Sequence, residues 1–168
     1  MLKKEAAMRQ VTPLTRRTLL LTALLLPLAR AQAATTKTLI EVWKTPTCGC
    51  CHDWVAHLEA KGFEVKTFDI SEAAKTAKRQ ALGMPEKLGS CHTALVQGFV
   101  LEGHVPARDI RRLLQERPRA LGLAVPGMPV GSPGMDGPAY GGRQDTYAVL
   151  LVQRGGAASV YQSYPLKS

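Results

Sequence analysis

The sequence has no apolar run long enough to cross a membrane. The longest, Leu19 to Leu28, has ten residues, whereas a helix that spans a hydrocarbon layer of about 30 Å needs about 20. A basic stretch ending at Arg16-Arg17 precedes this run, and the small residues of Ala31-Gln32-Ala33 follow it as a cleavage pattern. We therefore expect residues 1–33 to be a signal peptide of the Sec or twin-arginine type. The mature protein is expected to be periplasmic, with no stable membrane anchor.

Outside this segment the chain has little excess charge of either sign. The formal net charge is +9, but residues 34–168 hold 16 basic and 12 acidic side chains. The basic composition is therefore no argument for nucleic-acid binding, and we expect no nucleic acid among the partners. The basic residues of one predicted helix are interpreted as a solvated face: Arg108, Arg111, Arg112 and Arg117.

Cysteine is scarce, and its spacing does not fit the usual zinc pattern. The chain has four cysteines, at positions 48, 50, 51 and 91. A structural zinc site commonly has two C-x-x-C pairs, and this chain has one, Cys48 to Cys51. In an exported protein this pair could close a disulfide, whereas adjacent Cys50 and Cys51 are too close for an ordinary bridge. The disulfide hypothesis therefore stays open and would leave Cys50 and Cys91 free.

The four thiols together predict a site for a soft metal ion. Thiolate ligands select Cu(I), Zn(II) or iron–sulfur clusters, and the start of a helix stabilises thiolate. Adjacent side chains diverge, so Cys48, Cys50 and Cys51 are better suited to bridging several ions than to surrounding one. We therefore predict a multinuclear Cu(I)–thiolate site, with zinc as the less favoured occupant.

Imidazoles and thioethers near these thiols are candidate accessory ligands. His52 and His92 each directly follow a cysteine, and Met128 and Met135 lie in a Gly/Pro-rich segment that has no apolar stripe to fill. A methionine taken singly is more often a core filler. The complete set of predicted metal ligands is Cys48, Cys50, Cys51, Cys91, His52, His92, Met128 and Met135.

Hydrophobic periodicity predicts a mixed α/β fold. In chain order, the predicted elements are a strand at residues 38–43, a helix from Cys50 to Lys61, a strand at 63–70, a helix at 71–82, a hairpin of 93–96 and 99–101, and a helix that begins at Pro106. This order is the thioredoxin-like βαβα-ββα arrangement, and residues 34–118 supply it. The thiols lie at the first turn from strand to helix.

The predicted helices differ in the side that they bury. Cys51, Trp54 and Leu58 share one face of the first helix and should point inward. The apolar side of the second helix is mostly alanine, so this helix should pack closely and bury little surface. His57 and His104 are predicted to be surface or loop residues rather than ligands.

Residues 119–168 are predicted to extend the same domain. Residues 120–142 are rich in glycine and proline, so we expect a loop without a regular element. Residues 146–153 and 158–164 are predicted to form a β-hairpin around Gly155-Gly156. The complete fold prediction is a thioredoxin-like domain with an added Gly/Pro/Met loop and a C-terminal β-hairpin.

Several of these segments resemble those of a known family. They are Thr45 to Trp54, which contains Cys48-Gly49-Cys50-Cys51-His52, Ser90-Cys91-His92-Thr93-Ala94, and Glu102 to Ala107, together with Gly127-Met128-Pro129 and Gly131 to Met135. They are similar to the CxCC-motif periplasmic metal-binding proteins, which include the CopG-type copper-resistance proteins, over residues 38–164. The resemblance implies a thioredoxin-like fold, a periplasmic location and a cysteine-bridged copper cluster. Cys48, Cys50, Cys51 and Cys91 match the motif cysteines.

These observations lead to two hypotheses about function, a metal-binding protein and an enzyme. The resemblance implies a copper-binding protein for resistance or trafficking, with Cu(I)/Cu(II) exchange and other periplasmic copper-handling proteins as partners. The alternative is an enzyme, a thioredoxin-type thiol–disulfide oxidoreductase that uses Cys48 and Cys51. Thioredoxins carry a proline just before the third strand, where this chain has Cys91, and a thiol there would tend to trap a mixed disulfide. A role as a copper oxidoreductase stays open.

Overall fold

The structure is a computed structural model, and it describes residues 36–166. The predicted signal peptide, residues 1–33, lies outside the described residues. In chain order, the elements are β1 (Leu39–Lys44), α1 (Gly49–Ala60), β2 (Glu64–Asp69), α2 (Glu72–Ala81), η1 (Glu86–Leu88), β3 (His92–Val96), β4 (Phe99–Glu102), α3 (Ala107–Glu116), β5 (Gly122–Ala124), η2 (Pro138–Tyr140), β6 (Tyr147–Val152) and β7 (Ala158–Tyr164). The described part has no helix with both the length and the apolar character that crossing a bilayer requires.

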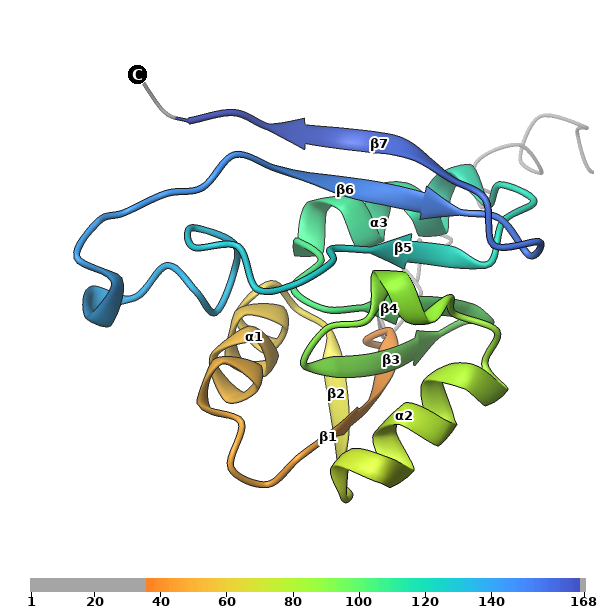
Figure 1. The fold of residues 1–168 in the computed structure, drawn as a ribbon, viewed down its shortest axis with the longest axis horizontal. Helices are drawn as coiled ribbons and strands as arrows, with labels where there is room; N and C mark the ends of the chain where they lie inside the picture. Colours follow the sequence, from red (N-terminus) through yellow and green to blue (C-terminus); the bar gives the residue numbers. More distant parts are fainter. Residues whose placement is uncertain (1–35, 167–168) are drawn as a thin grey trace, which may run out of the picture. The chain divides into compact units, whose positions relative to one another are not determined.

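The seven strands form one mixed sheet, which confirms the predicted α/β class. Their order is β2-β1-β3-β4-β5-β6-β7 (Figure 1). The pairs β1–β2 and β4–β5 are parallel, and the other neighbours are antiparallel. The strands and helices predicted between residues 38 and 118, and the terminal hairpin, are all present. The terminal hairpin joins the same sheet through β5.

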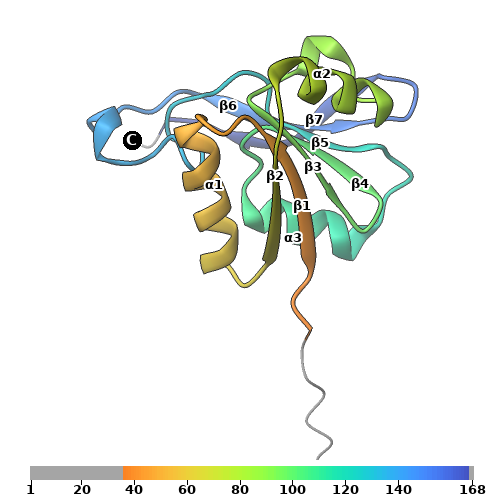
Figure 2. The ribbon, with the colours of Figure 1, turned by 90° about the horizontal axis from the view of Figure 1, so that it is seen from below.

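Helices cover both faces of this sheet (Figure 2). Helices α1 and α3 lie on one face, where Trp54, Leu58 and Ile110 join the main hydrophobic core. Helix α2 lies on the other face, which has a smaller apolar cluster that includes Leu88 and Val100. Because successive strand residues point to opposite faces, both layers draw side chains from the same strands.

Helix α2 buries a different set of side chains from the predicted one. The Ser71 side chain caps it by accepting a backbone N–H of the first turn at 3.2 Å, as expected. The prediction that alanines form its buried side is wrong, because its alanines are exposed and its buried residues are Lys75 and Arg79. Long aliphatic stems can cover the sheet while their charged ends reach polar partners. Lys75 donates to the carbonyl of Cys91 at 3.0 Å, and Arg79 pairs with Glu102 at 3.4 Å.

The prediction that residues 120–142 hold no regular element is also wrong. Strand β5 lies parallel to β4 and antiparallel to β6, and η2 forms a short 3-10 turn further on. A Cβ atom at Gly122 would lie 1.8 Å from the carbonyl oxygen of Val100. The glycine that indicated a loop therefore permits the close approach of β5 to β4.

The arginines of α3 form an exposed face, as predicted, and they also cover aromatic rings. Arg108, Arg111 and Arg117 are exposed, and Arg112 is half-buried. The Arg112 guanidinium lies 3.6 Å from the ring centroid of Tyr161 and donates to the carbonyl of Tyr161 at 2.6 Å. These contacts fix β7 against α3.

Candidate metal centre

The first three cysteines stand at the start of α1, where the chain turns out of β1. The Cys48 N–H donates to the carbonyl of Thr45 at 3.3 Å. Cys48 is the N-cap residue with an extended backbone, so the helix begins at Gly49. Cys51 is fully buried on the same side as Trp54. The predicted inward face of this helix is therefore confirmed.

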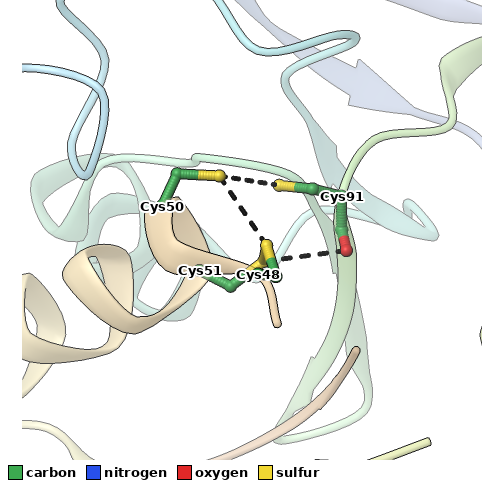
Figure 3. Close-up of side chains that lie close together, drawn as sticks. All are labelled: Cys48, Cys50, Cys51 and Cys91. Atoms are coloured by element: carbon green, nitrogen blue, oxygen red, sulfur yellow. Dashed lines mark hydrogen bonds between the residues drawn. A yellow bond between two sulfur atoms is a disulfide. The ribbon is translucent and has the colours of Figure 1, made fainter. Parts of the chain in front are cut away.

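Cys91 reaches this trio from the segment just ahead of β3 (Figure 3). Its Sγ lies 3.9 Å from the Sγ of Cys50, which in turn lies 3.7 Å from the Sγ of Cys48. The Sγ of Cys51 lies 3.7 Å from the carbonyl oxygen of Cys91. All four sulfur atoms lie within 4.8 Å of one another. Two segments that are far apart in the sequence therefore form one group of thiol side chains.

Two of these cysteines form a disulfide in this structure, Cys48 and Cys51. Their Cα atoms are 5.3 Å apart, within the ordinary range for a disulfide. Cys50 and Cys91 are free. The disulfide hypothesis that the sequence left open thus holds in this state of the protein. Binding of metal by all four sulfurs requires reduction of this bond first.

A buried carboxylate holds the Cys91 segment in place. Glu102 has no solvent exposure and accepts from the N–H of Ser90 at 2.6 Å and from Thr93 Oγ1 at 2.7 Å. Arg79 Nη1 lies 3.4 Å from the same carboxylate. Burial raises the pKa of Glu102, and these three donors oppose that shift. The residues on both sides of Cys91 are therefore tied to β4.

The environment of Cys91 disfavours its thiolate in the metal-free protein. Burial raises the pKa of the Cys91 thiol to about 12, and the neighbouring Cys50 adds to the shift. Cys91 therefore carries its proton at neutral pH. Because metals bind the thiolate, binding must displace this proton, as metal binding to thiols generally does.

His104 is a residue of this site that the sequence analysis did not select. It was predicted to be a surface or loop residue; it does lie in the loop after β4, but it is fully buried rather than on the surface. Its Nε2 lies 2.9 Å from the Sγ of Cys91, and its Nδ1 lies 2.8 Å from the carbonyl oxygen of Pro133. A carbonyl only accepts, so Nδ1 carries the hydrogen and Nε2 directs its lone pair at the sulfur. The available signal was its place in one of the segments that carry the family resemblance.

His92, a predicted ligand, is the second buried imidazole at this site. Its Nδ1 lies 3.5 Å from the Sγ of Cys91. Its ring packs 4.2 Å from the ring of Trp54 and 5.2 Å from that of His104. Burial lowers the pKa of both histidines, so both rings are neutral at neutral pH. Neutral imidazole is the form that binds metals.

His52 is directed away from the sulfur atoms. Its Nε2 lies 3.0 Å from the Nζ of Lys44. Lys44 is itself buried and forms an ion pair with Asp69 at 2.6 Å. The groups of clustered donor atoms within residues 36–166 do not include His52. Its role as a metal ligand stays a prediction that this geometry does not favour.

The two predicted methionine ligands occupy different environments. Met128 is 52% exposed and lines a cavity of about 530 Å³ together with Cys91. Met135 is buried, and its Sδ accepts from the hydroxyl of Tyr140 at 3.0 Å. Met128 therefore lies at the solvent side of the site and Met135 inside the loop. Their ligand roles stay predictions.

A mixed α/β framework that gathers four cysteine sulfurs beside two buried, neutral imidazoles offers the donor atoms that metal-binding proteins use for soft ions. Residues 88–135 match DUF411, a family of proteins of unknown function. No curated protein sequence matches the chain.

Two solved structures, both of a copper resistance protein CopG, match the chain. Form 1 is 48% identical, with a TM-score of 0.70, over 77% of this chain and 99% of that chain. Form 2 is 50% identical, with a TM-score of 0.70, over 77% of this chain and 100% of that chain. The chain therefore belongs to the CopG family of copper resistance proteins. The family and the cysteine cluster together fit a copper-binding role.

Proposed function

We propose that this protein holds several Cu(I) ions between the thiolates of Cys48, Cys50, Cys51 and Cys91, in copper resistance or trafficking. The observation that carries the proposal is the approach of four sulfur atoms to within 4.8 Å. The names of the two solved relatives support copper as the ion. Copper is the cargo in this proposal, and other copper-handling proteins are its partners.

The spacing of the sulfur atoms suits shared metal ions. Two sulfurs bound to one tetrahedral ion, with bonds of about 2.3 Å, lie about 3.8 Å apart. The observed separations are 3.7 Å between Cys48 and Cys50 and 3.9 Å between Cys50 and Cys91. Cys50 lies close to both neighbours, as expected for a bridging ligand. These separations suit sulfurs that share an ion, and the position of Cys50 between Cys48 and Cys91 is what supports the proposed multinuclear site.

A thioredoxin-like framework is part of the proposal. The strand order β2-β1-β3-β4, the parallel β1–β2 pair and the β3–β4 hairpin support it. So do the two helices on one face of the sheet and the single helix on the other. Because β1 and β3 are antiparallel neighbours, the turn from β1 to α1 and the start of β3 lie at the same end of these strands. The fold thereby brings Cys91 to the other three cysteines.

Exchange between Cu(I) and Cu(II) is also proposed, with Cys48 and Cys51 as the store of electrons. When both are thiols, two Cu(II) ions each accept one electron, the two sulfurs form a disulfide, and two protons leave. An external dithiol then reduces the disulfide and is itself oxidised. The Cys48–Cys51 bond in this structure supports the oxidised half of the cycle. A periplasmic location, reached through the predicted signal peptide, belongs to the same proposal.

The test is an anaerobic Cu(I) titration of the fully reduced protein in competition with a chromophoric chelator. We expect more than one Cu(I) per chain, and a lower stoichiometry in Cys50→Ser and Cys91→Ser. His57→Gln, about two helical turns beyond Cys50 and outside the groups of clustered donor atoms found within residues 36–166, is the matched control and should keep the full stoichiometry. A one-to-one ratio that neither cysteine substitution changes would refute the cluster.

The second candidate function is that of a thiol–disulfide oxidoreductase, which the Cys48–Cys51 disulfide favours. Cys91 counts against it, because a free thiol 3.9 Å from Cys50 offers a competing partner to any mixed disulfide. Reduction of insulin at the rate of a thioredoxin, by the same reduced protein, would favour this function instead.

A further inference from the structure

A cavity of about 640 Å³ lies where residues of α1, α3, β6 and β7 meet the loop of residues 131–133 (Figure 1). None of the four cysteines lines it, so it is separate from the metal centre. Sites for small molecules commonly have volumes of about 300–1,000 Å³. The chemistry of the cavity walls therefore indicates which ligand this volume suits.

The walls of this cavity are mostly apolar. The rings of Tyr147 and Tyr164 stack with their centroids 4.5 Å apart, and Pro106, Pro133 and Leu166 add aliphatic surface. Burial raises the pKa of Tyr147 to about 12, so this hydroxyl brings no charge to the cavity at neutral pH. A ring or an aliphatic group that entered would exchange water for apolar contacts, which is favourable.

The charged side chains of the cavity are all cationic. Lys61, Arg108 and Arg111 line it, and no aspartate or glutamate of the described residues does. None of the ion pairs found within residues 36–166 includes any of the three. His57 also lines the cavity, but burial lowers its pKa, so it is neutral at neutral pH. A concave site with one sign of charge attracts a ligand of the opposite sign.

Arg108 is held in a fixed position at this cavity. Its Nε donates to the hydroxyl oxygen of Tyr164 at 2.7 Å, and its guanidinium lies 4.5 Å from the centroid of that ring. The Tyr164 hydroxyl in turn donates to the buried carboxylate of Asp109 at 2.5 Å. The contact of Arg108 uses Nε and leaves the two Nη groups for a ligand. Two parallel N–H donors of one guanidinium match the two oxygens of a carboxylate.

The two nearest carboxylates of the protein already accept hydrogen bonds elsewhere. Asp109 accepts from Tyr164, and Asp136, whose charge acts on His57, accepts from the N–H of Gly134 at 3.1 Å. Neither of them lines the cavity. The anion that complements the three cations must therefore come from outside this part of the chain.

The other two cations differ in how they are held. Arg111 donates to the carbonyl of Lys61 and lies 5.2 Å from the ring centroid of Phe63. The side chain of Lys61 is exposed. Arg111 and Lys61 therefore add positive charge around the entrance, whereas Arg108 offers the fixed pair of donors.

We propose that this cavity binds a carboxylate that is attached to an aromatic or aliphatic group. The carboxylate pairs with the Nη groups of Arg108, and the apolar group lies against Tyr147 and the proline rings. The carboxylate belongs either to a small organic acid or to the last residue of a polypeptide, since the chemistry is the same. This inference goes beyond the proposed copper function and does not depend on it.

The test is an NMR titration of the ¹⁵N-labelled full chain with phenylacetate. We expect saturable shifts of the amide resonances of Ala107, Arg108, Ser163 and Tyr164, with one ligand per chain, and weaker binding at higher ionic strength. Phenylacetamide keeps the ring without the charge, and acetate keeps the charge without the ring. Both should bind at least about tenfold more weakly, because each lacks one half of the recognised group. Equal affinity for phenylacetamide, or no saturable shift with phenylacetate, would overturn the proposal.

A peptide separates the two sources of the carboxylate. Acetyl-Gly-Gly-Phe with a free C-terminus should bind, and the same peptide with a C-terminal amide should not. Tighter binding of the free-acid peptide than of phenylacetate assigns the cavity to the C-terminus of a polypeptide. Tighter binding of phenylacetate assigns it to a small organic acid. Equal binding of the two peptides would contradict recognition of the carboxylate.

Variants test the role of Arg108. Arg108→Gln should weaken phenylacetate binding about tenfold, and Arg108→Lys should not restore it, because an ammonium group lacks the paired donors. Arg119→Gln is the matched control, since it removes the same charge from an exposed residue outside the cavity. Retained affinity in Arg108→Gln would overturn the assignment.

A second variant covers the case in which loss of Arg108 disturbs the packing of Tyr164. Lys61→Gln changes an exposed side chain and should leave the fold intact. It should weaken binding about two- to fivefold, as expected for one exposed charge. Affinity that Lys61→Gln and a change of ionic strength both leave unaltered would show that the cations of the cavity do not bind the ligand.

Discussion

At the scale of single residues, Glu102 holds the segment that carries the isolated thiol of Cys91. Its carboxylate accepts from Ser90 and Thr93, which flank the Cys91–His92 pair, and faces Arg79. Glu102, Thr93 and Arg79 are buried, so their polar groups depend on one another and on Ser90 for hydrogen bonds. Loss of the carboxylate would leave a buried guanidinium and a backbone N–H without their partner.

We therefore predict that Glu102→Ala destabilises the metal-free protein. Breaking a buried ion pair by removing one partner costs about 3–5 kcal/mol, and we expect a loss of this size in the free energy of unfolding. Glu102→Gln should cost less, because the amide oxygen still accepts from Ser90. Urea denaturation of the three proteins measures this order. Equal stability of the alanine variant and the wild type would show that the carboxylate is not needed.

The sequence did not reveal this role, because a glutamate at the end of a strand is ordinarily exposed. The convergence of Cys91 with the other cysteines was predictable. The predicted arrangement of strands places the end of the first strand and the start of the third at the same end of the sheet. The position of His104 was not predictable, because its burial depends on a loop about 30 residues further along, whose path no periodic pattern specifies.

At the scale of elements, the loop of residues 131–135 determines how closely the second half of the chain approaches α1. Gly134 has a φ of +86°, a backbone conformation that favours glycine, and its backbone lies against Cys50 and Trp54. The adjacent Pro133 holds His104. The loop therefore fixes the first turn of α1 and one imidazole of the metal centre together.

We predict that Gly134→Ala disrupts this contact. The new Cβ would lie 2.6 Å from the carbonyl oxygen of Cys50 and 2.8 Å from the N of Trp54, both of which are backbone atoms. Overpacking of this kind costs about 1–3 kcal/mol, so thermal unfolding should begin at a lower temperature. Gly137→Ala is the matched control, because no atom lies within 4 Å of its added Cβ. Equal melting temperatures for the two variants would contradict this account of the loop.

The elements themselves were largely predictable, and the two exceptions have separate causes. Within residues 36–166, hydrophobic periodicity predicted all three α-helices and six of the seven strands. Strand β5 was missed because Gly122, which usually indicates a loop, is required by a close backbone approach. The buried side of α2 was assigned to alanine because Lys75 and Arg79 count as polar, although their stems pack like apolar chains.

At the scale of the whole molecule, the stability of the metal-free protein depends on neutral histidines. Burial lowers the pKa of His57, His92 and His104. In the unfolded chain these imidazoles titrate near 6.5. Below that pH the unfolded state binds protons that the folded state does not, so the free energy of unfolding falls. Their contribution is complete above the unfolded pKa and is lost as the pH falls toward the folded pKa values.

The prediction concerns His57, which accepts a hydrogen bond from the N–H of Ala107 at the start of α3. As the pH falls through about 6.5, the wild type should lose stability relative to His57→Gln, which has no proton to gain there. Urea denaturation of both metal-free proteins between about pH 5 and 8 measures the difference. A stability difference that stays constant over this range would contradict the assignment of a lowered pKa.

The terminal hairpin has a consequence for solubility. Strand β6 covers the outer edge of β5, and a polypeptide without this hairpin would present bare N–H and C=O groups for pairing with another chain. The intact sheet ends instead on β7, whose pairing with β6 is interrupted by a bulge near Val149 and Leu150. Bulged edges discourage association between sheets. The hairpin thereby protects the protein against aggregation along this side.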